Sequence, residues 1–206
     1  MKVLLLNGSP HENGTTKRAL VEVAKSLNEN GVETEILTVG NKRVAGCMAC
    51  GGCAKTGKCV FDDELIFEIV KKIEESDGVV IGSPVYYASI NGTLKAILDR
   101  VFYSKNSFAN KVGASVVVAR RAGTTATFDI INKYFAISSM PIVTSNYWNN
   151  VHGSNGAQAE LDEEGMQTMR ILGQNMAWLI KCIKFGKENG INAPILESKI
   201  KTNFIK

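Results

Sequence analysis

Two kinds of hydrophobic pattern alternate along this chain. Short uninterrupted apolar runs predict strands buried on both faces, and segments with apolar residues three or four positions apart predict helices that cover them. The predicted strands are 3–6, 35–39, 78–81, 114–118 and 142–145. The predicted helices are about 19–30, 65–73, 94–101, 125–138 and 163–188.

This alternation predicts an α/β fold in which a doubly wound parallel sheet of five strands lies between two helical layers. The expected strand order is 2-1-3-4-5, one of the two common orders for such sheets. Ligands bind beyond the carboxyl ends of the strands, so we expect a site after strands one, three and four. The segment 148–163, rich in Asn and Gly, is a candidate functional loop.

The length of the chain fits one domain. Its 206 residues can form a layered core without disulfide or metal staples. We assign residues 1–189 to this domain and residues 190–206 to a C-terminal tail. The tail carries Lys199, Lys201 and Lys206. It is expected to be solvated or to pack on a neighbouring subunit.

Composition and charge exclude several classes of protein. Hydrophobic residues make up 45% and charged residues 21% of the chain, as in ordinary globular proteins. No apolar run approaches the roughly 18 residues that span a bilayer, so no membrane insertion is expected. The net charge of +4 is scattered along the chain, which argues against nucleic-acid binding. Nothing resembles a signal peptide, and we expect a cytoplasmic location.

The first predicted strand runs into a polar, glycine-containing segment before its helix begins. A helix N-terminus offers unpaired N–H groups to an anion, and Ser9, Asn13, Thr15 and Thr16 can add hydrogen bonds to a phosphate. The alternative is an ordinary glycine-rich turn with a Thr N-cap. The segment lacks Gly-x-Gly-x-x-Gly, and no Lys-Ser/Thr follows Gly14, so dinucleotide and triphosphate motifs are absent. A monophosphate such as that of FMN fits the segment better.

Four cysteines follow one another in the glycine-rich loop 46–60, as Cys47-x2-Cys50-x2-Cys53-x5-Cys59. Thiolates at this spacing can hold a [4Fe-4S] cluster. Unliganded or redox-active thiols and a structural zinc ion are alternatives, because cysteine spacing reports a site more reliably than its occupant. Disulfides are disfavoured, since the rest of the chain is typical of a cytosolic protein.

Two more residues with reactive side chains have bland explanations. Cys182 lies in an apolar helical stretch and is expected to be a buried structural thiol. His152 has no evident carboxylate or cysteine partner in the sequence, so we expect a structural or interfacial role.

The chain resembles the flavodoxin-like NAD(P)H-dependent FMN reductases, in their iron-sulfur flavoprotein branch. The resemblance depends on the four-cysteine run and five further motifs, Gly8-Ser9-Pro10, Asp62-Asp63, Ser83-Pro84-Val85-Tyr86-Tyr87, Leu94-Lys95-Ala96-Ile97-Leu98-Asp99-Arg100 and Arg120-Arg121-Ala122-Gly123. These motifs extend over most of residues 1–123, and the C-terminal third carries less of the resemblance.

The resemblance implies a flavodoxin-like fold and assigns roles to particular residues. The implied phosphate ligands are Ser9, His11, Asn13, Thr15 and Thr16. The implied isoalloxazine contacts are Pro84, Val85, Tyr86 and Tyr87 on one side and Arg120, Arg121, Ala122 and Gly123 on the other. Packing in a core or an interface is the alternative for the two tyrosines. His11 departs from the pattern, because members often carry Arg after the Pro, and a solvated loop histidine is its alternative.

The function expected from this resemblance is that of an FMN-dependent oxidoreductase and electron-transfer flavoprotein. A [4Fe-4S] cluster would be bound by Cys47, Cys50, Cys53 and Cys59, and NAD(P)H would be a transient electron donor. No catalytic side chain is required, since the flavin carries the chemistry. A cluster-free FMN, quinone or azo reductase and a non-catalytic flavin or redox sensor are the alternatives. The resemblance also implies a small-molecule or protein acceptor and a homodimer or homotetramer.

Overall fold

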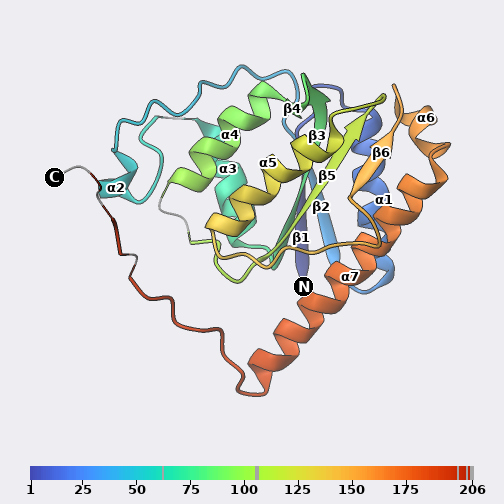
Figure 1. The fold of residues 1–206 in the computed structure, drawn as a ribbon. Helices are drawn as coiled ribbons and strands as arrows, with labels where there is room; N and C mark the ends of the chain where they lie inside the picture. The colour runs from blue at the N-terminus through green and yellow to red at the C-terminus, as the bar shows by residue number, and fades with distance from the viewer. Residues whose placement is uncertain (62, 105–106, 199, 203, 205–206) are drawn as a thin grey trace.

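A mainly parallel sheet forms the centre of the computed structural model, which describes the chain except residues 62, 105–106, 199, 203 and 205–206 (Figure 1). Asp62, Lys199 and Lys206, named above, lie outside the described residues. The strands are β1 (Lys2–Asn7), β2 (Glu33–Thr38), β3 (Gly78–Tyr86), β4 (Ser89–Ile90), β5 (Val112–Ala119) and β6 (Asn150–His152). Their order is β2-β1-β3-β5-β6, with β4 antiparallel to β3. This confirms the predicted order, apart from the added two-residue strand β4 and a fifth strand that is β6 instead of residues 142–145.

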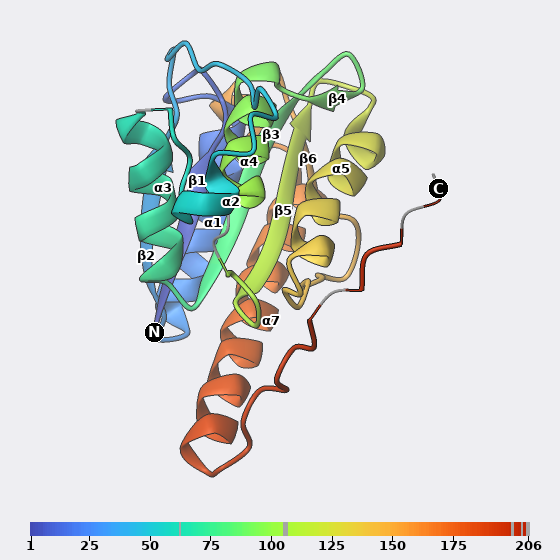
Figure 2. The same ribbon diagram turned by 90° about the vertical axis from the view of Figure 1, so that its left-hand side faces the viewer.

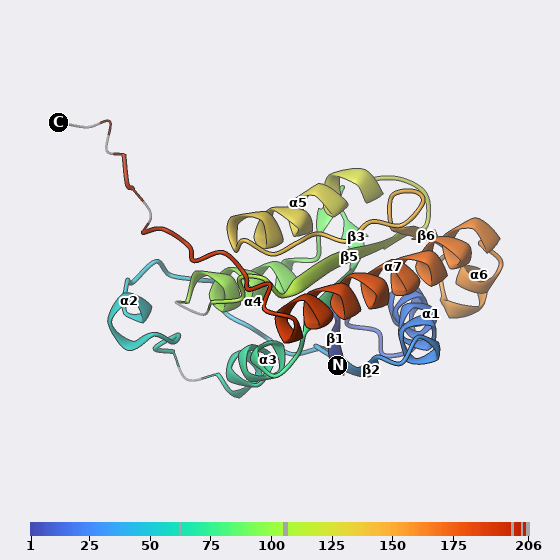
Figure 3. The same ribbon diagram turned by 90° about the horizontal axis from the view of Figure 1, so that it is seen from below.

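Helices cover both faces of the sheet. They are α1 (Thr15–Glu29), α2 (Cys53–Thr56), α3 (Glu64–Glu74), α4 (Gly92–Tyr103), α5 (Thr124–Ile137), α6 (Gly156–Glu160) and α7 (Glu163–Glu188). Side chains of α1, α6 and α7 join one hydrophobic core, and those of α3, α4 and α5 join the other. Figure 3 shows α5 and α7 on opposite sides of β5. The predicted three-layer architecture is therefore confirmed.

The first strand illustrates why uninterrupted apolar runs form this sheet. Val3 and Leu5 point into the core under α1 and α7, and Leu4 and Leu6 point into the core under α3 and α4. Successive side chains of a strand face opposite sides, so both faces must be apolar when both are covered. Each such side chain stabilises the fold by about 1.5–3 kcal/mol through burial.

The predicted fifth strand at 142–145 is wrong. Ile142 makes only an isolated bridge to Gly113, and the edge strand is β6, inside the segment predicted as a loop. The chain leaves the sheet between the two, and Asn149 fills the gap. Its side-chain amide donates to the Ser115 carbonyl over 2.9 Å, and its backbone carbonyl accepts from the Val117 N–H over 2.9 Å. The side chain and the backbone of one residue thus take the place of a stretch of strand.

The long helix α7 matches its predicted range but continues past the sheet (Figure 2). Its N-cap Asp162 accepts a hydrogen bond from the Gly165 N–H over 2.9 Å. Towards its C-terminus the sheet ends, and Trp178 and Phe185 are about two-thirds exposed, at 67% and 68%. Cys182 is also exposed, so its prediction as a buried thiol is wrong. Among the described residues, no helix has the length and apolar character needed to cross a bilayer.

A close approach of two backbones positions the loop after β1. The Gly8 N–H donates to the Gly82 carbonyl over 2.9 Å. A Cβ at Gly8 would lie 2.8 Å from that oxygen and 2.4 Å from a Leu94 methyl carbon. Only glycine fits here, and the contact holds the β1 loop against the middle of β3.

Candidate functional site

A cleft of about 1150 Å³ opens at the carboxyl ends of the parallel strands. It is lined by the last residues of β3 and β5 and by the loops after β1, β2, β5 and β6, so its position agrees with the predicted one. The predicted site residues that line it are Ser9, His11, Asn13, Thr15, Thr16, Pro84, Val85, Tyr86 and Arg120. The fold therefore brings the predicted phosphate ligands and part of the predicted ring contacts into one cavity.

One end of the cleft is suited to an anion. Helix α1 begins there, and its N-cap Gly14 provides no side-chain hydrogen bond to the first turn. The first N–H groups of a helix have no partner within the helix and carry the positive end of its dipole. Ser9 and Thr16 beside them are 3% and 1% exposed, so their hydroxyls lie in a largely dehydrated setting.

The hydroxyl groups at this end differ in what they can still donate. Ser9 Oγ accepts from the His11 N–H over 3.1 Å and keeps its hydrogen for a ligand. Thr15 Oγ1 uses its hydrogen to donate to the Gly153 carbonyl over 3.2 Å. Thr15 therefore ties the loop after β6 to α1, and it can donate to a phosphate only after rotating. His11 and Asn13 are exposed at the rim.

The other end of the cleft has an apolar wall. Pro84 and Val85 are half-buried there, and Tyr86 is 44% exposed at the start of the β3–β4 hairpin. The exposure of Tyr86 and of Tyr87, which is exposed throughout, excludes packing in the core of this chain. Tyr87 and Ala88 have φ of 51° and 55°, a left-handed backbone that costs non-glycine residues energy and often occurs at functional sites.

Four predicted ring contacts, Tyr87, Arg121, Ala122 and Gly123, are not among the described residues that line the cleft. Gly123 has φ of +89°, and a Cβ there would lie 2.8 Å from the Cα of Ala88 and 2.9 Å from Val85 Cγ1. The loop after β5 thus packs tightly against the hairpin that carries the wall. These residues remain predictions as flavin contacts, and in this structure Gly123 supports the wall from behind.

Sequence reasoning missed part of the lining. The last residue of β2 and the stretch 39–42 after it line the cleft, although only the ends of strands one, three and four were expected to do so. The predicted order places β2 beside β1, which was a usable signal. Residues 153–155 also line it, and they belong to the segment predicted as a functional loop.

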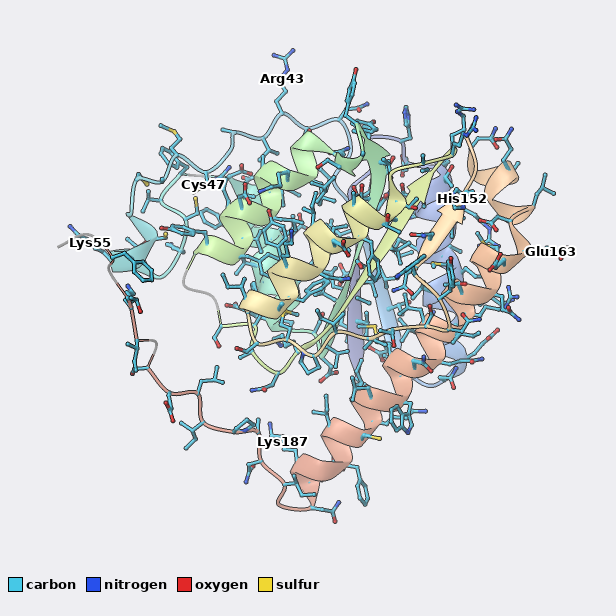
Figure 4. The ribbon with its side chains drawn as sticks, in the orientation of Figure 1. Arg43, Cys47, Lys55, His152, Glu163 and Lys187 are labelled. Atoms are coloured by element: carbon cyan, nitrogen blue, oxygen red, sulfur yellow. The ribbon has the colours of Figure 1, made fainter. Side chains whose placement is uncertain are left out.

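A second cavity of about 800 Å³ adjoins the cleft. The start of α4 closes the second cavity, and both cavities are lined by Pro10, Gly40, Asn41, Lys42 and Tyr86. Lys42 and Arg43 are its basic residues, and Figure 4 shows Arg43 extending away from the ribbon. We call this cavity the annex. Its position beside the apolar wall suits the anionic part of a second ligand.

The four clustered cysteines line a single small cavity. They carry free thiols, with Cys47 and Cys50 exposed and Cys53 and Cys59 half-buried. In Figure 4, Cys47 lies on the loop outside α4. The backbone is left-handed at Ala49, with φ of 53°, which supports the expected tight folding of this loop.

The cysteine cavity encloses about 20 Å³, room for roughly one water molecule. Among the described residues, no group of three or more His, Cys, Asp or Glu is arranged to hold a metal ion. A tetrahedral zinc site, which needs its ligands around one ion, is therefore not preformed there. A [4Fe-4S] cube is larger than one water molecule, so this loop would have to open outwards to hold one. The convergence of four thiols fits a cluster, and the present volume does not.

His152 has a carboxylate partner that the sequence did not reveal. The backbone N–H of His152 donates to Asp162 Oδ2 over 2.6 Å, and the ring Nδ1 lies 3.6 Å from the same oxygen. The expectation that His152 lacks a nearby carboxylate is wrong. Because Asp162 also caps α7, the pair fastens the end of β6 to that helix.

This sheet order, with an uncapped helix start and an apolar wall at the carboxyl ends of the strands, defines a flavodoxin-like protein. The fold is similar to an archaeal flavodoxin, with a TM-score of 0.61 at 13% identity over 88% of this chain and 99% of the flavodoxin. Residues 1–155 match the model of the NADPH-dependent FMN reductase family.

Two relatives are similar over nearly their whole length. The chain is 35% identical over 193 residues to an iron-sulfur flavoprotein of Methanocaldococcus jannaschii, covering 89% of this chain and 100% of the relative. It is 33% identical over 193 residues to an iron-sulfur flavoprotein of Methanosarcina thermophila, covering 91% and 100%. The chain belongs to the NADPH-dependent FMN reductase family, in its iron-sulfur flavoprotein branch, and is a flavin-dependent oxidoreductase.

Proposed function

We propose that the protein is an NAD(P)H-linked FMN oxidoreductase whose cysteine loop holds a [4Fe-4S] cluster. The observation that carries the proposal is the convergence of Cys47, Cys50, Cys53 and Cys59 on one cavity in a chain that also has the cleft. The names of the two relatives support the same pairing of flavin and cluster.

For FMN, the uncapped start of α1 and the hydroxyls of Ser9 and Thr16 would hold the phosphate. Pro84, Val85 and Tyr86 would lie along the ring. The cleft, at about 1150 Å³, is slightly larger than the usual range for small-molecule sites and has room for this cofactor. When bound, FMN supplies the exchange between two-electron and one-electron chemistry. The protein's part is to orient the ring and exclude water from it.

For the nicotinamide donor, the annex is the proposed entry. It adjoins the apolar wall at Tyr86, and Lys42 reaches both cavities. The described residues that line the annex include no carboxylate, so its charge suits the phosphates of NADH or NADPH. A small molecule or a protein would then accept the electrons.

For the cysteine loop, the cluster would supply one-electron transfer, and the four thiolates would be its ligands. The small volume of the present cavity favours one alternative, a reductase of FMN, quinones or azo compounds that holds no cluster. The proposal requires the loop to open when the cluster is assembled.

A homo-oligomer is part of the proposal. Apolar side chains are exposed on the end of α7 and on the tail, including Trp178, Phe185 and Ile195. The views from two sides show the tail running outside the layers of the domain (Figures 1 and 2). A second copy that covers these side chains would account for them, and Trp148, also exposed, is a further candidate for the contact.

The test is anaerobic expression with added iron, followed by absorption and electron paramagnetic resonance spectra and iron and sulfide analysis. Wild type is expected to contain four irons and four sulfides per chain, and Cys50→Ala is expected to lose them. Cys182→Ala is the matched control, because this exposed cysteine is far along the chain on α7. Wild type with FMN but no iron would support the cluster-free reductase. Bound FMN without NAD(P)H turnover would support a sensor.

A further inference from the structure

Arg100, on the face of α4 that borders the cysteine cavity, is almost completely buried, with 4% of its surface exposed. Arginine is rarely buried unless its charge and its donors find partners. It is the one charged side chain among the described residues that line the cavity. Its surroundings therefore indicate what the charge is for.

The guanidinium binds both ends of the cysteine loop. Nη1 donates to the carbonyl of Ala45 over 3.4 Å, just before the loop 46–60, and Nη2 donates to the carbonyl of Phe61 over 3.3 Å, just after it. One planar group thus joins two segments that are separated by the whole loop.

Asp63 completes the attachment. Its Oδ2 lies 2.6 Å from Arg100 Nη1. Asp63 is the N-cap residue of α3, yet its side chain does not cap that helix. An Asp at this position ordinarily bonds to the first turn. Here the carboxylate is turned to the arginine instead, which indicates that the ion pair is the stronger requirement.

One donor of Arg100 remains unused. Its Nε is buried and has no hydrogen-bond partner among the described residues. Burial lowers the pKa of Arg100, but interactions with Cys59 and Asp63 outweigh burial and raise it. Cys59 and Arg100 line the same cavity, and Nε has no hydrogen bond to this sulfur. A buried donor left unpaired is costly, and a ligand in the cavity would remove that cost.

We infer that Arg100 is a positioning residue for the cluster site: it clamps both ends of the loop 46–60 and sets a fixed positive charge beside Cys59. The clamp stands on this structure alone, whereas the effect on a cluster rests on the proposed function. A cluster with four thiolate ligands is anionic and becomes more so on reduction. A buried cation, or an N–H bond to a ligand sulfur, stabilises the reduced form and raises the reduction potential.

The proposed clamp fixes the two ends of the loop and leaves its interior to adjust. Its cavity is too small for a cluster at present, so the interior of the loop has to move when a cluster is assembled. Fixed ends limit this motion to the residues that carry the thiols, which lowers the entropy lost on closing the site.

The experiment compares Arg100→Met, Arg100→Lys and Asp63→Asn with wild type. The control is Lys95→Met. Lys95 is also a cation on α4, but it pairs with Asp99, lies over the Tyr134 ring and does not line the cavity. Amide hydrogen exchange of residues 46–60 is measured without iron, and the cluster potential is measured by a spectroscopic redox titration. Circular dichroism and FMN binding check that each variant folds.

Arg100→Met is expected to speed amide exchange across 46–60. It is also expected to lower the one-electron equilibrium constant for reduction at least tenfold, which is a fall of about 59 mV in the cluster potential. Arg100→Lys is expected to speed exchange but to keep the potential near that of wild type. Asp63→Asn is expected to raise the potential, because it removes a negative charge beside the site. Lys95→Met is expected to change neither.

The opposite potential shifts expected for Arg100→Met and Asp63→Asn separate an electrostatic role of Arg100 from a merely structural one. Potentials that shift in the same direction in Arg100→Met and Asp63→Asn would overturn the charge effect. Unchanged exchange in Arg100→Met would overturn the clamp. Absence of iron in wild type would refute the proposed cluster and the tuning role that depends on it, while the exchange measurement would still decide the clamp. If Arg100→Met does not fold, Arg100→Lys and Asp63→Asn still test both parts.

Discussion

The sharpest test of the cleft is the single substitution Ser9→Ala. Ser9 Oγ accepts from the His11 N–H and keeps one hydrogen that it can donate to a phosphate. A hydrogen bond to a charged group contributes about 1.5–3 kcal/mol. Because 1.4 kcal/mol corresponds to a factor of ten, loss of this bond should weaken FMN about 10- to 150-fold.

Comparison of two ligands isolates the phosphate. Titration of apoprotein is followed by quenching of flavin fluorescence, with FMN in one series and riboflavin, which has no phosphate, in the other. Ser9→Ala should weaken FMN and leave riboflavin nearly unchanged. Ser26→Ala is the control, because this α1 hydroxyl donates to the Arg170 carbonyl over 2.7 Å, outside the cleft. It should lower stability without changing the affinity for either ligand.

Two results would refute the reasoning. Equal losses for FMN and riboflavin would mean that the substitution disturbs the cleft as a whole. Unchanged FMN affinity would remove Ser9 from the phosphate site. Thr15→Val provides an internal comparison, because the Thr15 hydrogen already binds the Gly153 carbonyl. Its effect on FMN should be smaller than that of Ser9→Ala.

Three further predictions test other parts of the molecule. Gly8→Ala should destabilise the fold by about 1–3 kcal/mol through overpacking, since the new Cβ would lie 2.4 Å from a leucine of α4, and an unchanged melting temperature would contradict this. Lys42→Ala should raise the KM for NADPH with little effect on kcat; a change in kcat alone would indicate that the nicotinamide donor does not bind in the annex. Burial raises the pKa of Glu22, but hydrogen bonds to Arg170 and Arg18 outweigh it and lower the pKa. This carboxylate therefore stabilises the fold above its unfolded pKa, near 4.5, and the contribution is lost as the pH falls through the lower folded value. Urea unfolding from pH 7 to 3 should show a smaller acid-induced loss in Glu22→Gln than in wild type, and parallel losses would count against the ion pairs.

Most of the fold was predictable because its strands are buried on both faces. The alternation of Val3 to Leu6 between two cores requires an unbroken apolar run, and such runs are visible in the sequence. The edge strand was not predictable in this way. Ile142 and Val143 form an apolar run, yet only the three residues of β6 pair regularly there, because Asn149 interrupts the edge through a tertiary contact.

The site residues were predicted where a loop carries a motif of polar side chains. They were missed where only the position of a strand in the sheet places residues at the cleft. Ser9 and Thr16 stand out by residue type, whereas Val39 and Gly40 line the cleft because β2 lies beside β1. The direction in which a loop packs is also hidden from sequence patterns. Gly123 shows this, since it faces the hairpin behind the wall.

The interrupted edge at β6 also governs how sheets of two molecules can meet. A long, regular edge strand exposes a row of unpaired N–H and C=O groups that another chain can extend, and this is a common route to aggregation. Here the regular edge is only Asn150–His152. Just before it, the Asn149 side-chain amide donates to the Ser115 carbonyl of β5. A foreign strand therefore finds no continuous register to copy along this side. Contacts between copies at this edge must be made by side chains and not by a shared sheet.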